Sequence, residues 1–450
     1  MFEASILVPT PAKAHVMTRE PHRPTGHPSS LVLLAAALLA CQPEEASLTH
    51  PGCDPDNGGL SLPAGFCAVV FADSVGRARH IDVADDGTVF LALTNARGPD
   101  RSVIPGGVAV LRDLDRDGRA DEITRFGENG GNEVLLDNGF LYFASDDAVM
   151  RYPFTEGWAG PPGPPDTLVS NLPAVANHTA KSLALGPNRA LFVNIGSPSN
   201  ACQADSRTPG SPGLDPCPQL ETRAGIWLFD ADSLGQRQTD GIRFATGLRN
   251  VVALRTHPSG ALFGVVHGRD QLSSLWGDLF SDVDNAEKPS EEFVRIEEGD
   301  DFGWPYCYHD PATNQKVLAP EYGGDGTEVG RCADMNDPFI GFPAHWAPND
   351  LEFYAGTQFP EEYEGGAFIA FHGSWNRAPL PQAGYNVVFA PFQGEVPNGD
   401  WEVFADGFAQ RETSPRGALH RPVGLAVGPD GSLFISDSQR GTVWKVMYVG

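Results

Sequence analysis

The stretch GLAVGPDGSLFISDS, residues 424–438, places two short apolar runs on either side of a turn that contains Asp430-Gly431. Apolar runs around an Asp-Gly or Asn-Gly turn are the strongest short-range signal for a β-hairpin. Five similar stretches precede it: HIDVADDGTVFLAL (80–93), VLLDNGFLYFAS (134–145), SLALGPNRALFVNIG (182–196), VALRTHPSGALFGVVHG (252–268) and FPEEYEGGAFIAFHG (359–373). The sequence therefore predicts six related hairpins.

The spacing of these hairpins predicts their arrangement. A four-stranded propeller blade needs roughly 40–50 residues, and longer repeats place their insertions in loops on one face. The turns lie near positions 87, 139, 189, 260, 366 and 431. We therefore predict an all-β, six-bladed β-propeller over residues 59–450, with inserted loops on one face. The alternative, several small β-sandwiches, requires linkers that the sequence lacks. The long insertion between 260 and 366 is expected to build the ligand-binding face.

The composition favours a folded, acidic protein. The chain of 450 residues has 51 glycines and 39 prolines, which helices tolerate poorly, and 41% of its residues are hydrophobic. Its formal net charge of −27 repels nucleic acid, so we expect no nucleic-acid partner. The acidic side chains serve solubility, or some of them bind calcium.

The N-terminal region has the pattern of an export signal. The apolar run LVLLAAALLA (31–40) is too short to span a bilayer but fits a signal peptide. Cys41 follows it in a context that resembles a bacterial lipobox. We predict a lipoprotein signal peptide at 1–40 and a polar tether at 41–58, which anchor the protein in the inner or outer membrane, facing the periplasm or the exterior. The alternative is an ordinary secretory signal.

The remaining six cysteines form an even set, as expected in an oxidising compartment. Closeness in sequence favours three disulfides, which are Cys53–Cys67, Cys202–Cys217 and Cys307–Cys332. None of these cysteines belongs to a CxxC pair, so a zinc site is disfavoured.

Several segments carry a resemblance to a known family. The ordered set is NHTAKSLALGPNRALFVNIGSPSNAC (177–202), ATGLRNVVAL (245–254), HGRDQL (267–272), EGDDFGWPYCY (298–308), GTQFPEEYEGGAFIAFHGSWNR (356–377) and RPVGLAVGPDGSLFISD (421–437). It resembles the soluble pyrroloquinoline quinone (PQQ)-dependent sugar dehydrogenases, above all the sorbosone and aldose dehydrogenase branch. The resemblance implies a six-bladed propeller with PQQ and Ca²⁺ over its central channel.

His178 is the candidate catalytic base. It precedes a predicted strand, where a neutral imidazole can accept a hydroxyl proton. The resemblance implies that it deprotonates the anomeric hydroxyl of the sugar. The family orients this histidine with an aspartate, but Ser197 stands at the corresponding position. A serine can hydrogen-bond the ring but cannot stabilise an imidazolium by charge.

The resemblance also implies cofactor and metal ligands. Arg249 matches an arginine that faces a quinone oxygen, where a planar cation suits the charge gained on reduction, and Asn250 contacts the cofactor. Gly268 and Arg269 match two backbone carbonyl ligands of Ca²⁺. We interpret the next residue, Asp270, as a structural turn residue.

Two further arginines are candidates for binding the three carboxylates of PQQ. Guanidinium groups match carboxylate geometry, which indicates Arg377 and Arg421. His345, Trp346 and Trp375 are candidates for the pocket wall, where aromatic rings stack on flat cofactors and sugar faces, although aromatic side chains in propellers also fill blade cores.

An acidic loop stands apart from these motifs. The segment DLDRDGRADE (113–122) resembles a shortened calcium loop. It is either a structural calcium site or a solvated hairpin turn. Its candidate ligands are Asp113, Asp115, Asp117 and Asp121.

These features predict a PQQ- and calcium-dependent oxidoreductase that oxidises an aldose or a related sugar aldehyde and passes electrons to an acceptor that the sequence does not identify. Two alternatives remain. A propeller hydrolase of the lactonase kind would bind calcium through Glu, Asn and Asp side chains. A non-catalytic propeller would bind a carbohydrate or a protein.

The lipobox gives the first testable prediction. The mature chain should begin at an acylated Cys41, because lipobox cleavage precedes the modified cysteine. Mass spectrometry of the N-terminal peptide measures both features. Cys41→Ser should abolish acylation and release the protein from the membrane fraction. An unmodified Cys41, or cleavage at another position, would contradict the prediction.

Overall fold

A computed structural model describes residues 52–158, 160–175 and 177–450. The predicted signal peptide, Cys41 and most of the predicted tether lie outside the described residues. Residues 52–58 were assigned to the tether, yet they already pack on the domain. Asp54 accepts a hydrogen bond from Val70 N at 2.7 Å, and Asn57 accepts one from Ala68 N at 3.1 Å. The folded part therefore begins a few residues earlier than predicted.

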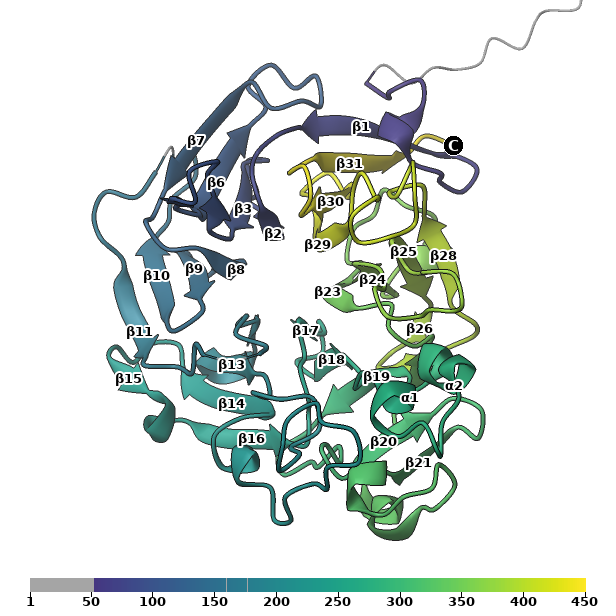
Figure 1. Cartoon of the computed structure of the whole chain (residues 1–450). Coiled ribbons are helices and arrows are strands. Elements are labelled where there is room, and N and C mark those ends of the chain that lie inside the picture. Colours follow the sequence, from purple (N-terminus) through teal and green to yellow (C-terminus); the bar gives the residue numbers. More distant parts are fainter. Residues whose placement is uncertain (1–51, 159, 176) are drawn as a thin grey trace, which may run out of the picture. The chain divides into compact units, whose positions relative to one another are not determined.

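Six four-stranded antiparallel sheets form a ring, with the first strand of each blade innermost (Figure 1). The first three blades are built from β2 (Ala78–Val83), β3 (Val89–Leu93), β6 (Gly107–Arg112) and β7 (Glu122–Phe126); β8 (Gly131–Asp137), β9 (Phe140–Ser145), β10 (Val149–Pro153) and β11 (Asp166–Ser170); and β12 (Leu183–Leu185), β13 (Ala190–Ile195), β14 (Gly225–Asp230) and β16 (Ile242–Thr246). A short strand, β15 (Gln236–Arg237), adds in parallel to the outer edge of β11.

The last three blades follow the same order. They are built from β17 (Ala253–Thr256), β18 (Leu262–Val266), β19 (Glu291–Ile296) and β22 (Ile340–Phe342); β23 (Pro348–Phe353), β24 (Ala367–Phe371), β25 (Asn386–Ala390) and β28 (Glu402–Ala405); and β29 (Pro422–Val427), β30 (Leu433–Asp437), β31 (Val443–Tyr448) and β1 (Phe66–Ala72). The predicted six-bladed propeller is confirmed, and five of the six predicted hairpins are the inner hairpin of one blade. The prediction is wrong in the fifth blade, where the stretch 359–373 contains only the second strand, β24, and the inner strand, β23, comes before it.

The remaining elements are short and lie in the connections. They are the hairpins β4 (Ala96–Arg97) with β5 (Val103–Ile104), β20 (Cys307–Asp310) with β21 (Gln315–Leu318) and β26 (Phe392–Gln393) with β27 (Val396–Pro397), the helices α1 (Leu272–Leu275) and α2 (Asp282–Glu287), and 3₁₀ turns at Asn57–Gly59, Pro187–Arg189, Pro218–Glu221, Gln238–Asp240, Pro320–Tyr322, Gly330–Asp334 and Glu361–Tyr363. Among the described residues, no helix is long and apolar enough to cross a membrane.

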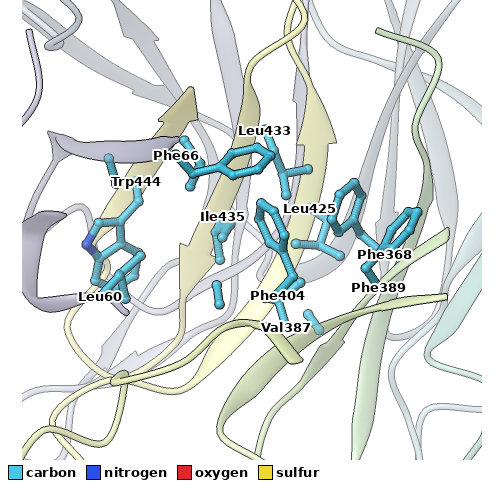
Figure 2. Packing of buried hydrophobic residues seen from close by; sticks show 14 of the residues in the cluster. Leu60, Phe66, Phe368, Val387, Phe389, Phe404, Leu425, Leu433, Ile435 and Trp444 are labelled. Carbon is cyan, nitrogen blue, oxygen red and sulfur yellow. The ribbon is translucent and has the colours of Figure 1, made fainter. Parts of the chain in front are cut away.

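The ring is closed by strand β1 from the start of the domain, which pairs with β31 from its end. Phe66 of β1 stacks edge-on against Phe359 and Phe404 of the fifth blade, at centroid distances of 4.8 and 5.0 Å. Figure 2 shows Phe66, Phe404 and Leu425 in one apolar layer between the last two blades. Burying these rings against both blades couples ring closure to the core.

The three predicted disulfides are confirmed. Cys53–Cys67 fastens the segment before the domain to β1. Cys202–Cys217 closes the long loop between β13 and β14, and Cys307–Cys332 closes the insertion between β19 and β22. Each bridge therefore constrains a segment that the blade sheets leave unpaired.

A buried histidine links blades across the axis of the ring. His80 of β2 is 1% exposed; its Nδ1 lies 2.7 Å from Glu133 Oε2 of β8 and its Nε2 lies 2.6 Å from the carbonyl oxygen of Asn349 in β23. Carboxylates and carbonyls accept hydrogen bonds, so both ring nitrogens donate and the ring is an imidazolium. Burial alone lowers the pKa of His80, but the charges of Asp350 and Glu133 raise it above its ordinary value.

The carboxylates around His80 extend these links. Glu133 also accepts from Leu183 N of β12 at 3.2 Å, and Asp350 accepts from Leu425 N of β29 at 2.8 Å. This axial cluster, His80 with Glu133 and Asp350, therefore joins the inner strands of five blades.

The axial cluster yields a stability prediction. His80→Gln should lower the free energy of unfolding by about 3–5 kcal/mol near pH 6, because it leaves two buried carboxylates without their cation. Since the folded-state pKa is raised, the contribution of His80 is complete below its unfolded pKa of about 6.5 and is lost as the pH rises through the folded value. Urea unfolding at several pH values should therefore show the two proteins converging at high pH.

His257→Gln is the matched control, because His257 lies in the β17–β18 turn, where its ring contacts Ser259 at 2.8 Å. An equal loss of stability in both variants, or a loss in His80→Gln that does not change with pH, would contradict the role of the axial cluster.

Candidate functional site

A cavity of about 540 Å³ lies among the loops at one end of the inner strands. In an antiparallel blade, the loop from the second to the third strand and the loop to the next blade leave the sheet at the same end. All residues that line the cavity belong to these two kinds of loop or to the strand ends beside them: Arg79, 177–180, Arg207, 249–250, Val252, 267–268, Asp270, Glu291, His345, Ala347, Asn349, 372–373, 375–376 and Arg421.

The predicted base, His178, lines this cavity in the loop before β12. Its Nδ1 lies 2.8 Å from the carbonyl oxygen of Ser197, which can only accept, so Nδ1 carries the proton and Nε2 is the bare nitrogen. Burial, and then the charge of Arg249, lower the pKa of His178 to about 3. The ring is therefore neutral at physiological pH.

The local backbone is built around this histidine. His178 has a φ of 53°, in the left-handed region that non-glycine residues seldom adopt and that concentrates at functional sites. A Cβ on Gly196 would lie 2.6 Å from both His178 Cβ and Asn250 Oδ1, so only glycine permits this approach. The hydroxyl of Ser197, 3.0 Å from His178 Nδ1, donates to the carbonyl oxygen of Ser199.

Arg249 and Asn250 enter the cavity from the connection between β16 and β17, and both are 5% exposed. The guanidinium of Arg249 donates to the carbonyl oxygen of Asn200 at 3.3 Å and to its Oδ1 at 3.0 Å. It also pairs with Asp270 at 3.2 Å. The planar cation predicted from the sequence is thus held rigidly in the cavity wall.

Asp270 does not have the structural turn role that we predicted. Its carboxylate lines the cavity, pairs with Arg249 and with Arg207 at 3.4 Å, and accepts from Asn376 Nδ2 at 2.8 Å. Burial raises the pKa of this carboxyl, but the surrounding charges, with Arg249 first and then His345 and Arg207, together outweigh burial, and the net shift is downward. Asp270 stays ionised and balances part of the cationic wall.

Arg421 lies in the cavity as predicted, just before β29. Its Nε and Nη2 donate to the carbonyls of His372 and Gly373 at 2.8 and 2.7 Å. Arg79 enters from the start of β2 and donates from Nε to Asn132 at 2.7 Å. Within the described part of the chain, Nη1 of Arg421 and both Nη groups of Arg79 have no acceptor, so they are available to an anionic ligand.

The predicted calcium ligands lie at the cavity wall. Gly268 lines the cavity, whereas Arg269 lines a smaller neighbouring space of about 30 Å³ and pairs through its guanidinium with Glu321. The carbonyl oxygens of Gly268 and Arg269 accept no hydrogen bond from any described residue. Glu291 accepts from the backbone N of Gly268 at 2.8 Å and from that of Ala347 at 3.2 Å, which fixes the segment. Burial raises the pKa of Glu291 to about 7.

The candidate wall residues divide into two groups. His345 lines the cavity and is held by a contact of 2.7 Å to the carbonyl oxygen of Asn285, and Trp375 stands at the rim, 58% exposed. Trp346 lies outside the lining and packs edge-on against Phe371 and Trp401, so it belongs to a blade core. The structure thus brings two of the three aromatic candidates to the cavity.

Arg377 is not brought into the cavity. Its guanidinium donates to the carbonyl oxygens of Ala286 at 2.7 Å, Ala344 at 2.9 Å and Pro381 at 3.3 Å. These bonds tie its loop to two neighbouring segments. Arg377 therefore holds the loop that carries Trp375. Arg79 and Arg207, which the sequence analysis did not single out, are the arginines that line the cavity in its place.

The acidic loop between β6 and β7 lies apart from the cavity. Carboxylate oxygens of Asp113, Asp115 and Asp117 lie within 4.8 Å of one another, the one such cluster among the described residues. Asp121 does not join it, because its Oδ2 accepts from Leu114 N at 2.7 Å. Three of the four predicted ligands thus come together at one point.

Sequence reasoning missed several lining residues, including Arg79, Arg207, His267, Asp270, Glu291 and His372. The signal that marks them is positional, because all lie at the same end of their blades, either at the start of an inner strand, as Arg79 does, or in and beside the loop between the second and third strands. His267-Gly268 and His372-Gly373 repeat one dipeptide after the second strand of two adjacent blades, which points to equivalent loops.

Fold and cavity together define a six-bladed propeller with a cationic pocket at one end of its axis. The chain belongs to the TrAA12-like family, whose model matches residues 60–449. It is 28% identical over 269 residues to a pyrroloquinoline quinone-dependent pyranose dehydrogenase of Coprinopsis cinerea, a match that covers 51% of this chain and 35% of that protein.

Two solved structures share the fold. The holo form of the pyranose dehydrogenase PQQ domain from Coprinopsis cinerea superposes with a TM-score of 0.68 at 20% identity, over 86% of this chain and 97% of that one. The calcium structure of a Trichoderma reesei enzyme of carbohydrate-active family AA12 has a TM-score of 0.68 at 19% identity, over 87% and 97% of the two chains. The predicted relationship to PQQ-dependent sugar dehydrogenases is confirmed.

The environment of His178 leads to a spectroscopic prediction. Histidine-labelled apoprotein should show a neutral His178 ring by NMR between about pH 5 and 8, because its pKa lies far below the ordinary value. Ser197→Asp should place a carboxylate beside Nδ1 and raise the pKa toward that range. The signal that is missing from the spectrum of His178→Gln identifies the ring of His178. A parent His178 that titrates near pH 6.5 would contradict this description of the site.

Proposed function

We propose that this protein is a PQQ- and calcium-dependent oxidoreductase that oxidises an aldose or a related sugar aldehyde. The observation that carries the proposal is the convergence of Arg79, Arg207, Arg249 and Arg421, from four separate segments, on one cavity that also contains a neutral histidine. Such a wall suits a ligand with several carboxylates, since guanidinium groups bind carboxylates in a planar, bidentate manner.

The donor set fits PQQ and Ca²⁺. Arg421 and Arg79 offer free N–H groups to carboxylates, and the unbonded carbonyls of Gly268 and Arg269 are the hard oxygen ligands that Ca²⁺ prefers. Bound PQQ with Ca²⁺ supplies an electrophilic quinone that accepts hydride. The PQQ and calcium named for the fungal relatives support the same assignment.

The residues of the chain supply the rest of the reaction. Ser197 fixes the tautomer of His178, so that Nε2 can accept the proton of a substrate hydroxyl. Asp270 and Asn200 hold Arg249 in place as a positive charge for an oxygen that becomes negative. The positive charge of Arg249 helps to lower the pKa of His178. An anionic ligand beside Arg249 would offset that charge and raise the pKa of His178 toward physiological pH.

A lactonase-type hydrolase fits this cavity less well. That chemistry needs carboxylates free to bind calcium, but Asp270 pairs with Arg249 and Arg207, and Glu291 accepts two backbone N–H groups. A propeller that only binds a ligand would not explain why the neutral imidazole of His178 lies among four arginines.

The three disulfides are those of an exported protein. On our proposal the acylated Cys41 anchors the propeller to a membrane on the periplasmic or outer side. The catalytic domain then meets its sugar outside the cytoplasm, and electrons leave to an acceptor in the same compartment.

Cofactor binding is the direct test. Titration of the apoprotein with PQQ in the presence of Ca²⁺ should show tight binding, and Arg421→Ala should weaken it about ten- to hundredfold, because one carboxylate loses a charged hydrogen-bond partner. Arg101→Ala, an exposed arginine outside the cavity, is the matched control. Removal of Ca²⁺ by a chelator should also weaken binding. Unchanged PQQ affinity after both treatments would contradict the proposal.

Turnover separates binding from chemistry in the same preparations. His178→Gln should retain PQQ but lose about 10²–10⁴-fold in kcat with a panel of aldoses, because the base is removed. Near-normal turnover by this variant would exclude His178 as the base, and firmly bound PQQ without turnover in the parent would favour the binding protein.

A further inference from the structure

A second hollow of about 670 Å³ lies beside the cavity and is lined by Trp375, Glu412, Ser414, Pro415, Arg416 and Gly417. Trp375 lines both spaces, so its side chain is a wall that they share. None of the other residues of the hollow lines the cavity. The hollow thus adjoins the cavity, with the side chain of Trp375 between the two spaces.

Trp375 is exposed on a rigid backbone. The preceding residue, Ser374, is fully buried; its hydroxyl donates to Gln382 at 2.8 Å, and its carbonyl oxygen accepts from Tyr385 at 2.6 Å. The following residue, Asn376, donates to Asp270 at 2.8 Å and accepts from Asn285 at 3.2 Å. The three carbonyl bonds of Arg377 complete these ties. The backbone that carries the indole is therefore held in place, although more than half of the Trp375 residue is exposed to solvent.

The facing wall of the hollow is also anchored. It belongs to the connection between β28 and β29, where Ala418 N donates to Ser414 O at 2.9 Å and Gln439 Nε2 donates to Pro415 O at 3.0 Å. At the end of this connection, His420 contacts the buried Asp437 at 2.9 Å. Both walls thus keep their shape without a ligand, which reduces the entropy lost when a ligand binds.

The charge of the hollow differs from that of the cavity. The cavity has four arginines and two acidic residues, Asp270 and Glu291, whereas the hollow has one arginine, Arg416, and one glutamate, Glu412. Both side chains are exposed and offer a donor and an acceptor without net charge. An indole face beside a balanced donor and acceptor matches a pyranose ring, which has an apolar C–H face and a rim of hydroxyl groups.

We propose that this hollow is a second sugar subsite and that the substrate is a neutral oligosaccharide. Its terminal sugar enters the cavity beside His178, and the adjoining sugar stacks on Trp375 and hydrogen-bonds to Arg416 and Glu412. The inference rests on the proposed oxidation of a sugar in the cavity. The one positive and one negative side chain of the hollow favour a neutral glycan over an anionic one.

Binding without turnover tests the subsite first. We would titrate two ligands into the apoprotein by calorimetry. One is a borohydride-reduced trisaccharide, which cannot be oxidised at C1, and the other is the matching monosaccharide alditol. Both reduced maltotriose and reduced cellotriose would be used as the trisaccharide. The trisaccharide should bind more tightly. Trp375→Ala and Arg416→Ala should each weaken trisaccharide binding about three- to tenfold, the size expected for one aromatic contact or hydrogen bond. Phe339→Ala, another exposed aromatic residue, is the control.

Kinetics of the PQQ-loaded protein test the same subsite. The ratio of kcat/KM for the trisaccharide to that for its terminal monosaccharide should exceed one and fall in both variants. The subsite is overturned if the kcat/KM ratio is the same in parent and variants and the reduced trisaccharide binds no more tightly than the monosaccharide alditol. This holds even if the protein oxidises the sugar. Trisaccharide binding that depends on Trp375 in a protein that binds no PQQ supports the subsite and refutes the proposed oxidation. Variants that slow only the transfer of electrons to a protein acceptor overturn the sugar assignment.

Discussion

The axial cluster of His80, Glu133 and Asp350 is the constraint on which the rest of the structure depends. A propeller blade makes its hydrogen bonds within its own sheet, so neighbouring blades need other contacts to fix their positions. Apolar layers such as that around Phe66 supply area but little directional restraint. The buried imidazolium adds direction, since its two N–H groups have partners in β8 and β23. Arg79, next to His80 in β2, reaches the cavity from this fixed base.

The alternation of strand direction explains why the cavity forms at one end. Residues separated by more than 300 positions, such as Arg79 and Arg421, meet because both stand beside the first strand of a blade. The long insertions extend the loops at this end, and the disulfides Cys202–Cys217 and Cys307–Cys332 restrain them. The sheets can therefore stay regular while the loops carry the chemistry.

Electrostatics within the cavity are arranged around a surplus of positive charge. Four arginines face a neutral His178 and two carboxyl groups, the paired Asp270 and Glu291, whose pKa burial raises to about 7. Holding so many cations together is unfavourable without an anionic ligand, which makes the cavity selective for one. Ser197 fixes the ring of His178 without adding a negative charge, so the basicity of the site depends on what is bound there.

The sequence by itself determined five of the six inner hairpins and the three disulfides, because these depend on local turn chemistry and short loops. It missed the inner strand of the fifth blade, which a connection separates from its partner strand. The places of His178, Arg249 and Arg421 came from motifs, contiguous in the chain, that carry the family resemblance. Only the tertiary structure showed that Asp270 balances the arginines, that Arg79 and Arg207 enter the cavity, and that Arg377 and Trp346 do not. Which side chains face a shared space is decided by how strands from different blades are placed around the axis. Contacts between residues far apart in the chain leave no periodic signal in the sequence.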